Sequence, residues 1–228
     1  LGDVYKRQED YIAVSRYARY LPEEKRREIW PETVDRYIKF FSELTNQKLE
    51  FLREPIQSKS VLPSMRALMT SGPALARDHC AAYNCAYTAI DHPRVFDEAL
   101  YIMLCGTGLG FSVERQHISK LPEVAESFHA TETVIIVADS KLGWAKALRE
   151  LVGMLYSGLV PNIDVSNVRP AGAPLKTFGG RASGPEPLER MFKHFIRTFK
   201  GAAGRKLNSI EVHDLICCLL YTSDAADE

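Results

Sequence analysis

The stretch that decides the fold is residues 94–113, which read RVFDEALYIMLCGTGLGFSV. Its first part, residues 94–104, predicts a helix, with Phe96, Leu100 and Met103 on one side. The glycine turn at 105–110 follows, and residues 111–113 then predict a strand. A dinucleotide-binding turn needs a strand before its glycines and a helix after them, so this reversed order argues against a Rossmann-type nicotinamide or flavin site. The glycines serve either a tight packing turn or a close approach of the backbone to a ligand.

Working outward from this stretch, strands alternate with helices, which predicts an α/β sheet or barrel. Asp139 or Ser140 is expected to cap a helix that ends at Ser157-Gly158. The predicted strands are 82–89, 133–138 (buried) and 162–165, and the predicted helices are 141–156, 187–200 and 209–217. The sequence before about residue 58 reads as a helical region. A helix is expected to open at Pro22, and its stripe of Trp30, Val34, Tyr37, Ile38 and Phe41 is expected to be core. A catalytic-type domain is expected over 59–217.

Composition bounds the class of protein. The chain has 228 residues, of which 46% are hydrophobic, enough to bury a core. Lys and Arg together number 29 and so do Asp and Glu, so bulk charge does not predict binding to nucleic acid. No apolar run approaches the roughly 20 residues that span a bilayer. The irregular cysteine spacing favours a reducing, cytoplasmic compartment over a disulfide scaffold.

The two ends of the chain are expected to be non-native. Residues 3–8 can be encoded by GAT GTG TAT AAG AGA CAG, and the reverse complement, read one frame along, encodes the CLLYTS found at 218–223. This inverted element resembles the transposase adapters of shotgun sequencing libraries. We therefore expect residues 1–8 and 218–228 to be adapter-derived. The native segment then runs from about Glu9 to Cys217.

A glycine- and proline-rich loop and one cysteine are the candidates for chemistry. The loop at 169–187 carries Arg169, Lys176 and Arg181, which suit an anion or phosphate cradle, although a solvated surface loop explains it equally well. Cys85 lies within a predicted strand. Cys80, Cys105 and Cys217 are expected to be inert core residues, and the six histidines share no spacing typical of a triad or metal site. No metal site is therefore expected.

Several segments together resemble the monomeric, adenosylcobalamin-dependent (class II) ribonucleoside-triphosphate reductases. They follow the order of that family and cover nearly the whole native segment. The matching segments are 63–75 (PSMRALMTSGPAL), 83–87 (YNCAY), 96–115 (FDEALYIMLCGTGLGFSVER), 139–144 (DSKLGW), the loop at 169–187, and 211–214 (EVHD).

The resemblance implies the N-terminal half of a ten-stranded α/β barrel of the ribonucleotide reductase and glycyl radical enzyme type, preceded by a helical region. It implies an oxidoreductase that replaces the ribose 2′-hydroxyl by hydrogen through a thiyl radical, for DNA synthesis. Cys85 matches the first-strand member of the redox-active cysteine pair. The second redox cysteine, the radical cysteine and the central-loop Asn and Glu would lie beyond residue 217. The residues that bind adenosylcobalamin would lie mostly outside the chain too.

The resemblance also implies two ligand sites. The substrate site would include Ser64, Asn84, Gly106, Gly108 and Gly110. An allosteric site for a deoxynucleoside triphosphate effector would include Asp139, Ser140, Arg169, Lys176 and Arg181. The implied partners are a ribonucleoside triphosphate and a thioredoxin-type reductant, with no nucleic acid or membrane, and the full-length protein would be monomeric.

Two alternatives stay open from the sequence. A diiron or glycyl-radical reductase would share the barrel, but the YNCAY and GGRASGPEP motifs argue against it. A non-catalytic nucleotide-binding regulator could have kept the loops and lost the chemistry. Half a barrel would leave strand edges and apolar faces uncovered, so we expect this polypeptide alone to be inactive and aggregation-prone.

Overall fold

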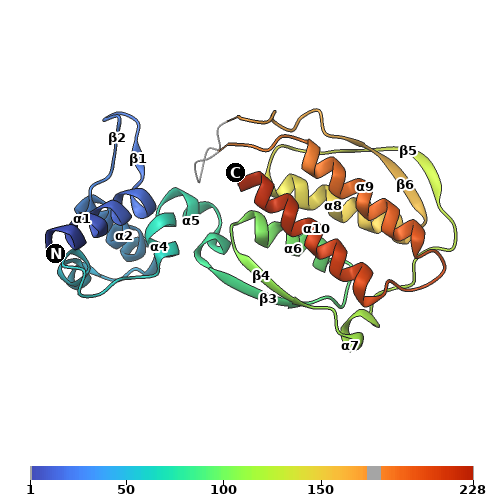
Figure 1. Cartoon of the computed structure of the whole chain (residues 1–228), viewed down its shortest axis with the longest axis horizontal. Helices are drawn as coiled ribbons and strands as arrows, with labels where there is room; N and C mark the ends of the chain where they lie inside the picture. Colours follow the sequence, from blue (N-terminus) through green and yellow to red (C-terminus); the bar gives the residue numbers. More distant parts are fainter. Residues whose placement is uncertain (1, 174–180, 228) are drawn as a thin grey trace. The chain divides into compact units, whose positions relative to one another are not determined.

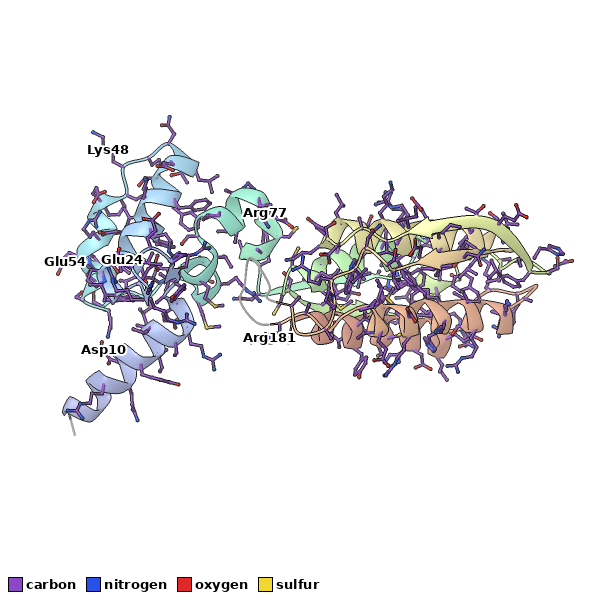
Figure 2. The ribbon with its side chains drawn as sticks, turned by 90° about the horizontal axis from the view of Figure 1, so that it is seen from above. Asp10, Glu24, Lys48, Glu54, Arg77 and Arg181 are labelled. Atoms are coloured by element: carbon purple, nitrogen blue, oxygen red, sulfur yellow. The ribbon has the colours of Figure 1, made fainter. Side chains whose placement is uncertain are left out.

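The computed structural model describes residues 2–173 and 181–227 (Figure 1). The chain forms two compact units, Leu1–Asn84 and Cys85–Glu228, and each is treated by itself. Charged side chains on the first unit, such as Lys48 and Glu54, point outward from its surface (Figure 2). The division expected near residue 58, with a helical region before it and a catalytic-type domain over 59–217, stays a prediction.

The first unit is mainly helical, as expected. Its small core is formed by Val34, Ile38 and Ile56, each at most 1% exposed, with Trp30 and Tyr37 packed against them. The elements in order are α1 (Gly2–Ile12), a π-helical turn (Ala13–Tyr17), β1 (Tyr20–Leu21), β2 (Arg26–Arg27), α2 (Trp30–Thr45), a 3-10 turn (Glu50–Leu52), α3 (Arg53–Gln57), α4 (Met65–Thr70), α5 (Pro73–Arg77) and a second 3-10 turn (His79–Ala82).

The helix expected from Pro22 was placed too early. Residues 20–27 instead form a small antiparallel hairpin, β1–β2, whose turn holds Lys25 at a φ of 55°. Helix α2 begins at Trp30, with Pro31 in its first turn. The Glu32 carboxylate accepts a hydrogen bond from the Ile29 backbone N–H at 2.8 Å, which satisfies one of the donors left free at a helix start.

The second unit contains two strand–helix–strand elements, each with parallel strands. The chain runs through β3 (Cys85–Ala89), α6 (Val95–Leu104), β4 (Gly108–Ser112), α7 (Arg115–Ile118), β5 (His129–Ile136), α8 (Lys141–Tyr156), β6 (Leu159–Asp164), α9 (Glu186–Gly201) and α10 (Ser209–Asp227). Strand β3 pairs with β4, and β5 pairs with β6. The predicted alternation of strands and helices is therefore confirmed.

The core of the second unit lies among helices α6, α8, α9 and α10, which run close together in Figure 1. Its largest side chains include Phe96, Phe192, Phe195 and Phe199, all at most 1% exposed. Phe96 of α6 meets Phe195 of α9 edge to face, with ring centroids 5.7 Å apart. Edge-to-face pairs add to the free energy of burial, so this contact helps to join the two helices.

The two ends predicted for helix α8 are confirmed. Ser140 is the N-cap, and its hydroxyl accepts a hydrogen bond from the Gly143 N–H at 3.0 Å. The helix ends before Gly158, whose φ is +75°. Helix α10 continues past the expected end at Cys217 to Asp227, with Leu219 fully buried.

Two strand predictions need correction. Strand β4 begins at Gly108, within the glycine segment, rather than at Phe111. Strand β5 was expected to be buried, but only one face is covered within the described residues. Ile135 is 3% exposed, whereas Val134 is 50% and Ile136 is 62% exposed. Side chains alternate between the faces of a strand, so the second apolar face of β5 lies open.

Over the stretches that the structure describes, none of the helices has the length and apolar character needed to cross a membrane.

Candidate functional site

The candidate active site is the exposed face of the β3–β4 pair. Cys85 lies opposite Gly108 in the register of the two strands, and Tyr87 lies opposite Gly110. All four residues are exposed. Paired residues of neighbouring strands point to the same face of a sheet, so the Cys85 side chain stands beside two positions that carry no side chain.

The opposite face of the same two strands packs against the core. Leu109 and Phe111 alternate with the glycines of β4 and contact the buried cluster. Ala86 and Thr88 of β3 are half-buried on that side. Because this apolar face packs against the core, the other face of the β3–β4 pair is exposed. The register of the two strands places Cys85 on that exposed face.

The presence of glycine at Gly106 and at Gly110 is explained by different structural features. Gly106 has a φ of +76°, a conformation that favours glycine, and its N–H donates to the Met103 carbonyl at 2.8 Å just after α6. At Gly110, a Cβ atom would make only ordinary contacts, 3.8 Å from the Ala86 carbonyl and from the Tyr87 ring. Among the residues that the structure describes, neither backbone conformation nor packing requires glycine at position 110. What glycine provides there is open space above the strand.

Ser64 and Asn84, the other expected substrate residues, belong to the first compact unit. Ser64 is exposed and immediately precedes α4, but its hydroxyl makes no cap to that helix. Asn84 is exposed and adjoins Cys85 along the chain. The structure therefore brings Cys85, Gly108 and the glycine turn together within the second unit.

Three of the expected effector residues lie at the start of α8. The Arg169 Nε donates to both oxygens of Asp139, at 2.9 and 3.1 Å, and Ser140 follows as the helix cap. The side chains of Asp139 and Arg169 are 33% and 26% exposed, so this ion pair lies at the surface. Asp139 and Arg169 join the end of β5 to the loop after β6.

The remaining effector candidates lie in the loop itself. Arg181, labelled in Figure 2, donates to the Gly172 carbonyl at 2.9 Å. Gly172 and Ala182 are joined by a backbone hydrogen bond of 2.8 Å, and another of 2.8 Å runs from Ala182 to Ala173. These bonds bring the two described ends of the loop together. Lys176 lies outside the described residues.

A close backbone approach explains Gly143, which the sequence did not single out. A Cβ atom there would lie 2.4 Å from the Ala138 carbonyl oxygen and 2.8 Å from the Ala138 Cβ. Real Cβ atoms do not come that close, so only glycine lets α8 start directly beside the end of β5. Gly143 thereby sets the position of Asp139 and Ser140.

The structure also contains two ion-pair networks around buried carboxylates that the sequence analysis did not predict. Asp97 is 2% exposed, and its carboxylate accepts from Arg94 of the same helix region at 3.1 Å and from Arg149 of α8 at 2.9 Å. In the first unit, Glu28 is 5% exposed and pairs with Arg36 at 2.8 Å. Asp97 and Arg149 are 52 residues apart and Glu28 and Arg36 are eight apart, and neither spacing is one that sequence patterns could reveal.

The cysteine expectations are confirmed in part. Cys105 is fully buried, as expected of an inert core residue. Cys217 was expected in the core but is exposed on α10, where its Sγ lies 3.6 Å from the His213 Nε2. The helical period turns position 217 outward, while Leu215 and Ile216 face the core. Cys80 is half-buried. Among the described residues, no group of three His, Cys, Asp or Glu side chains is arranged to hold a metal ion.

Comparisons with known proteins show which proteins this chain is similar to. Residues 115–199 match the family model described as "B12-dependent ribonucleotide reductase, insertion domain". The chain is similar to the B12-dependent ribonucleotide reductases. It is 27% identical over 281 residues to the adenosylcobalamin-dependent ribonucleoside-triphosphate reductase of Lactobacillus helveticus (strain DPC 4571), covering 90% of this chain and 37% of that protein.

Other reductases give the same result. The adenosylcobalamin-dependent ribonucleoside-triphosphate reductase of Lactobacillus leichmannii is 27% identical over 275 residues, covering 90% of this chain and 37% of that protein. A putative reductase of the same name from Mycobacterium phage D29 is 28% identical over 214 residues, covering 77% and 30%. The chain thus spans between 30% and 37% of the length of these relatives.

The fold agrees with that of a solved B12-dependent (class II) ribonucleotide reductase. The TM-score is 0.79 at 23% identity, with 94% of this chain and 40% of the other chain covered. The expected fold, an α/β fragment of the reductase type, is confirmed. The expected family resemblance is confirmed too. The roles of individual site residues stay predictions.

Proposed function

We propose that this chain is part of an enzyme that reduces ribonucleoside triphosphates to 2′-deoxyribonucleoside triphosphates, with Cys85 as one of the two reducing thiols. The observation that carries the proposal is the register of β3 and β4, which sets the Cys85 side chain beside Gly108 on the open face of the ribbon. A thiol on a strand is held more rigidly than one on a loop. A group that must react with a bound ribose needs such a fixed position.

The chemistry assigned to Cys85 balances with one partner thiol. The 2′-hydroxyl leaves the ribose as water, and a hydrogen replaces it at C2′. Two electrons come from Cys85 and a second cysteine outside the chain, which become a disulfide. A thioredoxin-type reductant then restores both thiols by exchange. Cys85 is exposed, which such an exchange requires.

Ser64, Asn84, Gly106, Gly108 and Gly110 are proposed to line the site for the ribose and phosphates. Backbone N–H groups and a hydroxyl suit phosphate oxygens, and glycines let the ligand approach closely. The ribonucleotide reductases of the comparison take ribonucleoside triphosphates by name. Triphosphates are therefore proposed as the substrates.

A deoxynucleoside triphosphate effector is proposed to bind at the start of α8, near Asp139, Ser140, Arg169, Lys176 and Arg181. The guanidinium groups supply positive charge for phosphates, and the helix N-terminus adds a favourable dipole. Adenosylcobalamin is proposed as the cofactor that generates the radical, bound mostly by residues outside this chain. The full-length protein is proposed to be monomeric and cytoplasmic.

The test uses the full-length gene. Replacing Cys85→Ser should abolish multiple turnover with thioredoxin as reductant, since a disulfide can no longer form. The matched control is Cys217→Ser, which removes another exposed thiol and should leave turnover unchanged. Undiminished turnover by the Cys85 variant would overturn the assignment of this thiol.

The chain expressed alone is proposed to be inactive and aggregation-prone, because β5 exposes Val134 and Ile136 on an uncovered face. Size-exclusion chromatography tests this. A monodisperse product with ribonucleotide turnover would contradict it.

A further inference from the structure

The first unit contains a buried ion pair between Glu28, just before α2, and Arg36 within it. The Glu28 carboxylate accepts from Arg36 Nε at 2.8 Å and from Arg36 Nη2 at 2.9 Å, a two-bond fork. It also accepts from the Thr33 hydroxyl at 3.0 Å and from the Arg19 backbone N–H at 3.1 Å. The carboxylate is thus fully engaged and holds the guanidinium in one orientation.

The same guanidinium holds the carbonyl end of α4. Arg36 Nη1 donates to the Leu68 carbonyl and to the Ser71 carbonyl, each at 2.9 Å, and to the Ser71 hydroxyl at 2.7 Å. Arg19 Nη2 donates to the Thr70 carbonyl at 3.1 Å. The last carbonyls of a helix lack intrahelical partners and carry partial negative charge, so two guanidinium groups satisfy them well.

The chain turns sharply where this cluster ends. Gly72 follows Ser71 with a φ of +106°, and its added Cβ would lie 3.9 Å from both Arg19 and Arg36. The clamp, defined as Glu28, Arg36 and Arg19, therefore holds the carbonyl end of α4, and its arginine side chains lie beside the turn that follows.

Helix α4 is short, and Ser64 precedes its first residue. At about 1.5 Å of rise per residue, Ser64 lies roughly 10 Å along the axis from the clamped end. The six residues of α4 are all that separate Ser64 from Ser71, so a hold on the carbonyl end acts within about two helical turns of Ser64.

We propose that Arg36, held by Glu28, is a positioning residue that orients α4 so that Ser64 meets the substrate. This inference rests on the proposed function, because it takes Ser64 as a substrate contact. A buried ion pair gives weak grounds for expecting stability alone, since well-packed apolar residues often do as well. Its bonds to backbone carbonyls of another element, by contrast, specify one placement of that element.

The test compares Arg36→Met with Arg26→Met in the full-length protein. Arg26 makes a similar fork to Glu32, at 2.7 Å to each oxygen, but has no bond to α4 in the described contacts. With ATP as substrate and a dithiol as reductant, Arg36→Met should raise KM between about tenfold and 100-fold, the loss typical of a misplaced binding group. Arg26→Met should stay within about twofold.

Two further readouts separate positioning from mere stability. Amide hydrogen exchange over residues 64–71 should accelerate in Arg36→Met but not in Arg26→Met. Ser64→Ala should raise KM in the wild-type background and have little further effect in Arg36→Met, because residues that act together are not additive. If Arg36→Met does not fold, Arg36→Lys, which keeps the charge but loses the fork, should show a smaller change of the same kind.

The outcomes distinguish this inference from the proposed function. A wild-type protein that reduces no ribonucleotide would overturn the proposed function and with it the role of Ser64. An active wild type in which Arg36→Met and Arg26→Met have equal KM values would overturn the positioning role alone. Additive effects of the Ser64 and Arg36 variants would overturn it as well.

Discussion

Helix α8 contains two glycines at which the same substitution should have opposite effects. At Gly153, an added Cβ meets nothing within 4 Å. Alanine is a better helix former than glycine by about 1 kcal/mol, so Gly153→Ala should stabilise the protein by roughly 0.5–1 kcal/mol. At Gly143, the same gain is opposed by a contact of 2.4 Å with the Ala138 carbonyl oxygen.

The clash at Gly143 should outweigh the gain in helix propensity. Overpacking of this kind costs about 1–3 kcal/mol, so Gly143→Ala should be destabilising by up to about 2 kcal/mol. Because Ala138 adjoins Asp139, the displaced backbone should also weaken binding of a deoxynucleotide effector. The two variants should therefore lie on opposite sides of the wild type.

Thermal unfolding of the full-length protein measures the first effect. A difference of 1 kcal/mol moves the Tm of a domain of roughly 150–250 residues by about 2–4 °C and that of a larger protein by less, so the order of the two Tm values about the wild type is the decisive result. Calorimetric titration with a deoxynucleoside triphosphate measures the second. A Tm for Gly143→Ala equal to or above that of Gly153→Ala would show that α8 and β5 do not approach as closely as described.

Three other substitutions test buried polar groups. Tyr156→Phe should leave stability unchanged or raise it by up to about 1 kcal/mol in urea unfolding, because burial raises the pKa of the Tyr156 hydroxyl and that oxygen has no hydrogen-bond partner among the described residues; a clear loss would reveal a missing partner. Asp97→Asn should cost about 1–3 kcal/mol, towards the lower end because its arginine partners are half-exposed, while the surface variant Asp91→Asn should stay within about 0.5 kcal/mol. Burial opposes ionisation of Glu28, but the interactions with Arg36, the Arg19 backbone and Thr33 together outweigh it and lower the pKa of Glu28 below its ordinary 4.5. Its contribution to stability should therefore be complete above pH 4.5 and be lost as the pH falls through the lowered value, and Glu28→Gln should flatten the acid limb of a Tm–pH profile.

Local signals in the sequence carried much of the fold. The bounds of α8 followed from a serine cap and a terminal glycine, and α6 followed from its apolar period. These features depend on a few neighbouring residues. The hairpin at 20–27 was missed because Pro22, Glu23 and Glu24 are typical of a helix start, while the turn depends on the left-handed backbone of Lys25.

The candidate site likewise has parts that local sequence patterns predict and parts that they do not. Cys85 and the glycine turn were found from motifs, but the register that sets Cys85 opposite Gly108 joins strands separated by a helix, which no local pattern encodes. The bond from Arg149 to Asp97 spans 52 residues, and that from Arg36 to Ser71 spans 35. Such contacts arise only when the elements pack.

The parallel pairing of β3 with β4, closed by the single helix α6, has a consequence for synthesis on the ribosome. Each strand–helix–strand element is contiguous in the chain, β3 to β4 first and β5 to β6 next. Each can close before later segments emerge, since domains generally form from the N-terminal side during translation. The β3–α6–β4 element that carries Cys85 should therefore form early on the nascent chain. Its core is completed only when α10, which packs against α6, has been synthesised.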